Sequence, residues 1–163
     1  MAGLIGGLLP LSPALPAFWI FAVLGVGLAI IDVRQRRLPH ALTGTLWATS
    51  VLCFATTATL TGNVSPLLRA LIAGLVASTA LLIVALALPG QLGLGDVTLA
   101  GAITLNLGWL SWQATATGFL GGLVIQGFVG LAAKVRTRSN NAVPMGPALV
   151  AGWLAGLLLL QAH

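Results

Sequence analysis

The chain has only two acidic side chains, Asp32 and Asp96, in 163 residues, and it contains no glutamate. Each aspartate lies at the edge of a long apolar stretch, where an isolated carboxylate is costly to bury. Two carboxyl groups held a few ångströms apart cannot both ionise, so they share one proton. In such a pair the ionised member can take a proton from an attacking water, while the protonated member stabilises the oxyanion that forms. Any aspartyl chemistry of this chain must therefore use Asp32 and Asp96.

The composition indicates which solvent surrounds these acids. Charged residues make up 6% of the chain and hydrophobic residues 58%, with a mean hydropathy of +1.08. A soluble domain carries about 25% charged residues, so the chain is expected to be an integral membrane protein. Its apolar stretches are close to the ~20 residues that a spanning helix needs, and they lack the alternation of a membrane β-strand.

We therefore predict an all-α fold, a polytopic transmembrane helix bundle of about six spans. The predicted spans are residues 17–33, 41–60, 67–88, 95–107, 112–133 and 146–161. Residues 1–16 are expected to form an N-terminal non-cytoplasmic segment, and residues 17–163 a membrane-embedded domain.

The basic residues predict the orientation. Six of the seven lie in two clusters, one after the first predicted span and one after the fifth. In a six-span arrangement both clusters lie on one side, which is cytoplasmic because cytoplasmic loops carry excess Lys and Arg. Both termini are then outside, and both aspartates lie at the cytoplasmic boundary. The clusters are Arg34, Arg36 and Arg37, and Lys134, Arg136 and Arg138.

The basic residues, together with the cysteine and the histidines, also indicate which partners and cofactors to expect. The basic clusters are short and juxtamembrane, which predicts contacts with anionic membrane lipids rather than with nucleic acid. The chain has a single cysteine, Cys53, and two distant histidines, so we predict neither a metal site nor a cofactor.

Each aspartate also has a structural alternative. Asp96 could be an ordinary N-cap of the helix that follows it. Asp32 could be an interfacial acid paired with Arg34 or Arg36, although at a helix C-terminus its charge opposes the helix dipole. Gly93 and Gly95, beside Asp96, would allow a tight turn and the close approach of a substrate backbone.

Glycine spacing predicts how some of the helices pack. Gly118 and Gly122 form one pattern of small residues four apart, and Gly152 and Gly156 form another. Such spacings let membrane helices approach closely enough for their backbones to be in van der Waals contact. We expect these glycines to serve helix packing.

Three motifs resemble those of a known family. Gly93-Leu94-Gly95-Asp96 resembles the Gly-x-Gly-Asp signature of membrane aspartyl proteases. The segment from Asp32 to Leu38-Pro39 resembles the partner motif of the type IV prepilin leader peptidases, and Pro144-Met145-Gly146-Pro147 is similar to the Pro-x-Gly-Pro element before their last helix. Together these motifs extend the resemblance over nearly the whole chain from about Ala17 onward.

The resemblance implies an aspartic-type endopeptidase of the bacterial cytoplasmic (inner) membrane. Such an enzyme cleaves the short basic leader from prepilin or pseudopilin precursors at the cytoplasmic face, in type IV pilus assembly and protein secretion. By this resemblance Asp32 and Asp96 are catalytic. The residues that it implies for substrate positioning are Gly93, Gly95, Pro144, Gly146 and Pro147.

Features that differ from larger members of the family indicate which type of leader peptidase the chain resembles. The first cytoplasmic loop is too short for the cysteine-containing insertion of larger relatives, so methyltransferase activity is not predicted. The chain looks like the compact, peptidase-only form associated with tight-adherence pili. It departs from the family at Thr98, where Lys is usual, and at His40, where Asp or Asn is commoner.

Two other functions compete with the peptidase. Intramembrane acids also serve as proton relays, so a small proton-coupled membrane transporter is one alternative. A noncatalytic pilus-assembly membrane factor, with the aspartates as helix caps, is the other.

Overall fold

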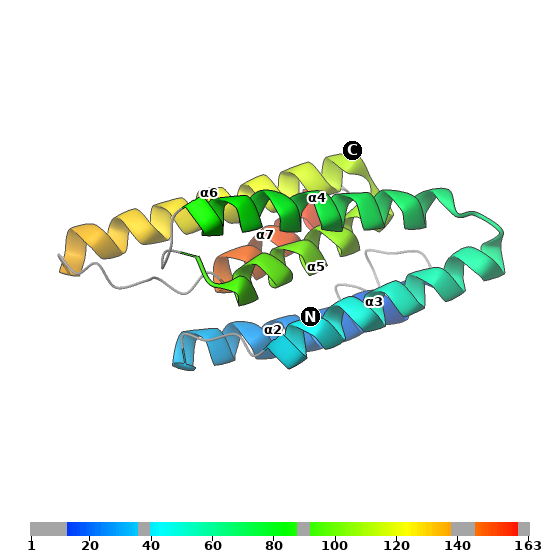
Figure 1. The fold of residues 1–163 in the computed structure, drawn as a ribbon, viewed down its shortest axis with the longest axis horizontal. Helices are drawn as coiled ribbons and strands as arrows, with labels where there is room; N and C mark the ends of the chain where they lie inside the picture. Colours follow the sequence, from blue (N-terminus) through cyan, green and yellow to red (C-terminus); the bar gives the residue numbers. More distant parts are fainter. Residues whose placement is uncertain (1–12, 36–39, 88–91, 138–145, 160–163) are drawn as a thin grey trace.

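The computed structural model describes residues 13–35, 40–87, 92–137 and 146–159, and these residues form six helices and no strand. The all-α prediction is thus confirmed for the described residues (Figure 1). The helices are α2 (Leu15–Gln35), α3 (His40–Thr61), α4 (Ser65–Ala87), α5 (Leu94–Leu110), α6 (Trp112–Thr137) and α7 (Gly146–Leu159).

Three of the helices are long and apolar enough to cross a membrane. These candidate spans are Leu15–Asp32, Ser65–Ala87 and Trp112–Ala132, and the shorter helices α5 and α7 are apolar as well. Helix α3 has the length of a span but is rich in threonine, and several of its hydroxyls donate to carbonyls of the preceding turn. The six-span count remains a prediction.

Helices α5 and α6 extend several residues beyond their predicted C-terminal ends. Helix α5 was expected to end at Leu107 but continues to Leu110, and α6 continues past Ala133 to Thr137. Ser111, in an extended conformation, separates α5 from α6, and its hydroxyl accepts a hydrogen bond from the Ala114 N–H at 3.0 Å. Such N-capping at Ser111 starts α6 within one residue of the end of α5.

Arg69 in α4 stabilises the end of α5. Its guanidinium donates to the carbonyl oxygens of Gly108, Trp109 and Leu110 at 2.6–2.9 Å. The last carbonyls of a helix have no partners within the helix, and a cation there also complements the helix dipole. Arg69, the one basic residue outside the two clusters, therefore caps the C-terminal end of α5.

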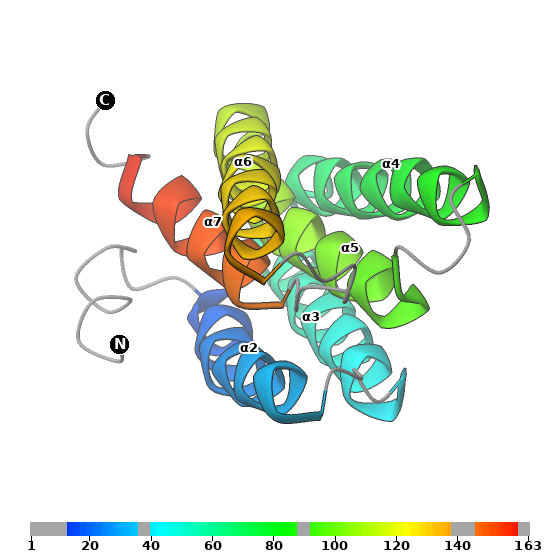
Figure 2. The same cartoon turned by 90° about the vertical axis from the view of Figure 1, so that its left-hand side faces the viewer.

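Helix α5 lies at the centre of the bundle, with α3, α4, α6 and α7 around it (Figure 2). Almost all of its residues from Gly95 to Gly108 are buried. Small residues let α4 approach it: a Cβ on Gly74 would come within 3.1 Å of the Gly101 carbonyl oxygen, and one on Gly108 within 2.9 Å of the Ala70 Cα. Close backbone contact of this kind holds membrane helices together.

The predicted glycine pairs form the interface between α6 and α7. A Cβ on Gly152 would come within 2.6 Å of the Gly122 backbone and would also collide with the Gly118 carbonyl oxygen. A Cβ on Gly156 would lie 3.1 Å from the Gly118 Cα. The helices therefore cross at the four glycines, as the spacing predicted.

Candidate active site

The bundle brings the two aspartates to the same end. Asp32 lies near the C-terminal end of α2, and Asp96 lies in the first turn of α5. Figure 1 shows these helix ends on the left, together with the start of α7 and the end of α6. The two carboxylates are close enough for their charges to interact. Asp32 is only 4% exposed, and Asp96 is partly buried.

Asp32 is bound to the beginning of α7. Its Oδ2 accepts a hydrogen bond of 2.8 Å from the backbone N–H of Gly146, the first residue of α7. The N-terminus of a helix carries a partial positive charge, which stabilises a carboxylate placed there. The unfavourable interaction of Asp32 with the dipole of its own helix is thus offset by a second helix.

The alternative that Asp32 pairs with Arg34 is not supported. No ion pair joins Asp32 to Arg34, and both side chains belong to the described part of the chain. Arg34 is exposed, whereas Asp32 faces inward. Two positions apart on a helix, the two side chains point in different directions. Arg36 lies outside the described residues.

Asp96 is not the N-cap of α5. That position belongs to Gly93, and Asp96 is the third residue of the helix. Its Oδ2 accepts a 3.3 Å hydrogen bond from the Gly93 N–H, which is the carboxylate half of a capping box. Its Oδ1 is buried and has no hydrogen-bond partner among the described residues. One oxygen of Asp96 therefore stabilises the helix start, and the other is unused within the described structure.

Two of the three glycines predicted to position substrate, Gly93 and Gly146, contact the aspartates. A Cβ on Gly146 would lie 2.9 Å from the Asp32 Oδ2, and one on Gly93 would lie 3.2 Å from the Asp96 Oδ2. Gly95 is buried at the start of α5, and Pro147 follows Gly146 in the first turn of α7. Pro144 lies outside the described residues. The small size of Gly93 and Gly146 thus leaves room for the two carboxylates.

Trp47 of α3 is hydrogen-bonded to the beginning of α5, near Asp96. The sequence did not indicate that it would lie close to the candidate site. Its indole N–H donates to the Thr98 carbonyl oxygen at 3.0 Å, and its ring lies against Gly74 and Gly101. This bond joins α3 to α5 two residues after Asp96. A tryptophan in the middle of an apolar stretch carries no signal of such a contact, because the contact depends on how the helices pack.

Thr98 is the residue that departs from the family pattern, and its hydroxyl is used locally. It donates to the carbonyl oxygens of Gly95, at 2.9 Å, and Leu94, at 3.2 Å. Threonine hydroxyls in helices commonly bond to the preceding turn in this way. Thr98 therefore adds no charge next to the aspartates.

Comparison with known proteins agrees with two of the three motifs. The model of the type IV leader peptidase family matches residues 19–133, which include Asp32 and the Gly93–Asp96 segment. Neither the curated proteins nor the solved structures contain a significant match to the chain. Membership of the family implies prepilin peptidase activity. Because the match covers most of the sequence, the chain belongs to the type IV leader peptidase family.

Proposed function

We propose that the protein is a membrane aspartyl endopeptidase that removes the short basic leader from prepilin or pilin-like precursors, with Asp32 and Asp96 as its catalytic dyad. The observation that carries the proposal is the convergence of the chain's only two acids, whose charges interact at one end of the bundle. A pair of carboxyl groups that shares a proton is the group that activates water in aspartyl proteases.

The proposed reaction is a hydrolysis in which the pair acts as one unit. The ionised carboxylate takes a proton from water as the water oxygen attacks the scissile carbonyl carbon. The protonated carboxyl hydrogen-bonds to the oxyanion, and the leaving nitrogen receives a proton as the C–N bond breaks. Asp96 Oδ1 is suited to bind the attacking water or the oxyanion, because it has no hydrogen-bond partner within the described residues. The proton belongs to the pair and not to either residue.

The membrane arrangement that we propose has six spans, with both termini outside and the dyad at the cytoplasmic face of the bacterial inner membrane. In support, the last turn of α2, which carries Arg34, and the end of α6, which carries Lys134 and Arg136, lie at the same end of the bundle as the aspartates (Figure 1). Anionic lipids of that leaflet would attract the basic leader of the substrate. We further propose that the protein is the compact, peptidase-only type associated with tight-adherence pili.

One alternative function has a specific observation in its favour. Both aspartates accept backbone N–H bonds at helix starts, Asp32 from α7 and Asp96 from α5. In a noncatalytic assembly factor, the two aspartates would serve only to accept these backbone hydrogen bonds. The transporter alternative has less support, because both acids lie at one end of the bundle and not halfway along it (Figure 1).

The proposal is tested by a cleavage assay with purified protein. The full chain is reconstituted in vesicles that contain phosphatidylglycerol, together with a precursor that has a basic leader, a glycine and then an apolar helix. We expect a single cut that releases the leader, identified by mass spectrometry of both products. Proton uptake without peptide, and no cleavage of any precursor of this type, would instead support the transporter.

Gly146→Ala is expected to slow leader cleavage by about 10- to 100-fold while the protein remains folded. The added Cβ would come 2.9 Å from the Asp32 Oδ2, so the carboxylate must move from the position that the Gly146 N–H holds. A displacement of about 1 Å at a reacting group can cost about 100-fold in rate. Gly27→Ala is the matched control on α2, because no atom lies within 4 Å of its added Cβ. Equal rates for the two variants would show that the position of Asp32 does not matter.

A further inference from the structure

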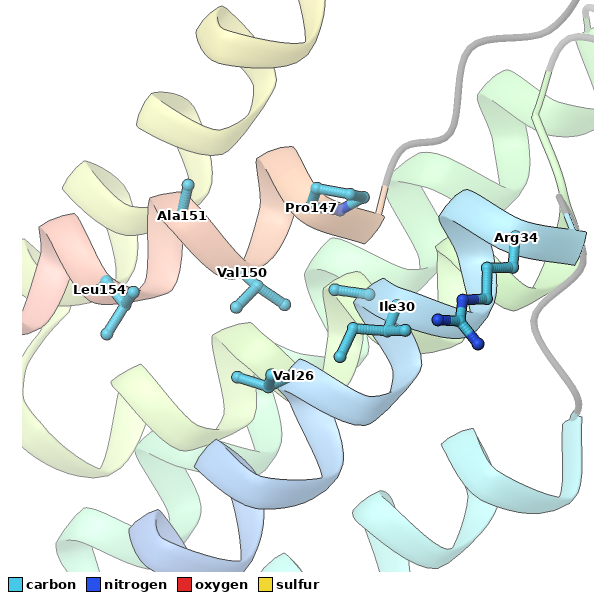
Figure 3. A pocket seen from close by; sticks show the side chains of 8 residues that line it. Val26, Ile30, Arg34, Pro147, Val150, Ala151 and Leu154 are labelled. Atoms are coloured by element: carbon cyan, nitrogen blue, oxygen red, sulfur yellow. The ribbon is translucent and has the colours of Figure 1, made fainter. Parts of the chain in front are cut away.

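An open groove runs along the surface between α2 and α7, separate from the aspartates. It has a volume of about 400 Å³, and Val26, Ile30 and Arg34 line it from α2, with Pro147, Val150 and Leu154 from α7. All of these side chains except Arg34 are apolar. In Figure 3, Arg34 lies at one end of the groove and Leu154 at the other. The groove is therefore apolar along its length and positively charged at one end.

We propose that this groove binds one anionic phospholipid, with an acyl chain along the apolar wall and the phosphate at Arg34. The proposal goes beyond the peptidase, because it assigns a ligand to a surface that does not include Asp32 or Asp96. It is also more specific than attraction to a basic surface, because it commits to one cation and one groove.

Charge complementarity favours a phosphate at this place. Arg34 is exposed, and it forms no ion pair within the described residues. A guanidinium matches the oxygens of a phosphate, to which it can donate two parallel hydrogen bonds. Arg34 lies in the last turn of α2, at the end of the bundle proposed to face the anionic cytoplasmic leaflet. The apolar part of the groove thus lies where the acyl chain of a lipid in that leaflet would lie, and Arg34 lies where its headgroup would lie.

Size and charge both argue against a peptide helix as the occupant. From Val26 to Arg34 the groove follows nine residues of α2, which span about 12 Å, and a helix about 10 Å across would fill roughly 900 Å³ over that length. With a volume of about 400 Å³, the groove would leave more than half of such a helix outside it, whereas an acyl chain is much thinner and fits within it. Arg34 would also repel the basic leader of the proposed substrate.

The experiment uses phosphatidylglycerol and phosphatidylcholine that carry the same acyl-chain spin label. The full-length protein is reconstituted in unlabelled phosphatidylcholine, and electron spin resonance measures the motionally restricted fraction of each labelled lipid. We expect phosphatidylglycerol to be preferred about fivefold, which is the effect of one cation near the membrane surface. Arg34→Gln should abolish the preference, and Arg34→Lys should retain part of it.

Matched variants separate the groove from general attraction to the basic surface. Arg136→Gln removes one cation from the other basic cluster and should lower the preference much less than Arg34→Gln does. Ala29 also lines the groove, so Ala29→Phe adds bulk to its wall and should reduce the restricted phosphatidylglycerol. Ala80→Phe makes the same change at an exposed position on α4, which does not line the groove, and should not. Equal effects of Arg34→Gln and Arg136→Gln, or of Ala29→Phe and Ala80→Phe, would overturn the proposal.

Two competition measurements identify the occupant. Inorganic phosphate should not displace labelled phosphatidylglycerol more than chloride of the same ionic strength, and displacement would show a site for the ion alone. A leucine-rich transmembrane peptide with uncharged flanks should leave the restricted fraction unchanged. Displacement by the peptide would show that the groove binds helices and would refute the lipid assignment. None of these readouts depends on peptidase activity, so the two proposals can fail independently.

Discussion

Replacing either aspartate by asparagine is expected to lower the rate of leader cleavage by at least about 10³-fold while the protein stays folded in the membrane. Asparagine has nearly the same shape as aspartate, and its carbonyl oxygen can still accept the N–H bond of Gly146 at position 32 or of Gly93 at position 96. What Asp32→Asn and Asp96→Asn remove is the ionisable proton. The measurement is the initial rate of leader release under single-turnover conditions.

The same pair of variants decides between the peptidase and the capping factor. If the aspartates serve only as caps, the asparagine variants should cleave as fast as the original protein, or cleavage should be absent from all three. The double variant adds a sharper comparison. Members of one catalytic unit are strongly non-additive, so we expect it to be about as slow as either single variant. A further loss of about 10³-fold in the double variant would show that the two acids act independently.

Gly152→Ala is expected to destabilise the bundle by about 1–3 kcal/mol, the usual cost of overpacking a close interface. The new Cβ would lie 2.6 Å from backbone atoms of Gly122. Backbone atoms cannot move aside as the end of a long side chain can, so α6 and α7 must separate and lose contact along their length. The measurement is unfolding of the purified protein in mixed micelles of increasing denaturing-detergent content, followed by circular dichroism.

The control for this variant is a glycine on α6 that faces away from α7. No atom lies within 4 Å of a Cβ built on Gly127, and this residue is exposed. Alanine favours a helix over glycine by up to about 1 kcal/mol, so Gly127→Ala should leave stability unchanged or slightly increased. Similar losses for Gly152→Ala and Gly127→Ala would mean that close approach of α6 to α7 does not govern stability.

Most of the helices could be predicted from the sequence, because apolar length and composition are local properties of the chain. The starts of α3 and α6 lie within one residue of their predicted positions. The error at the end of α5 has a tertiary cause, since the carbonyls of its last turn bond to Arg69, 39–41 positions away. Nothing near Leu107 in the sequence indicates that its helix will be extended by a side chain of another helix.

The candidate site shows the same division. That Asp32 and Asp96 must work together, if either does chemistry, follows from composition alone, because the chain has no other acid. Gly93 and Gly146 were predicted to position substrate, and the structure adds that both lie against the carboxylates, which the sequence did not indicate. A glycine in a sequence indicates that space is needed for something, but only the surrounding structure shows what fills that space.

By itself, the sequence determined that the protein is an apolar helical bundle with a single pair of acids and two clusters of cations, because these are properties of residue type and order. Only the tertiary structure decided that Asp32 binds the start of α7 and not the nearby Arg34. Asp32 and Gly146 are 114 positions apart, and their 2.8 Å hydrogen bond exists because α2 and α7 pack together. On a helix, residues two apart point in different directions, whereas packing can bring distant residues into contact.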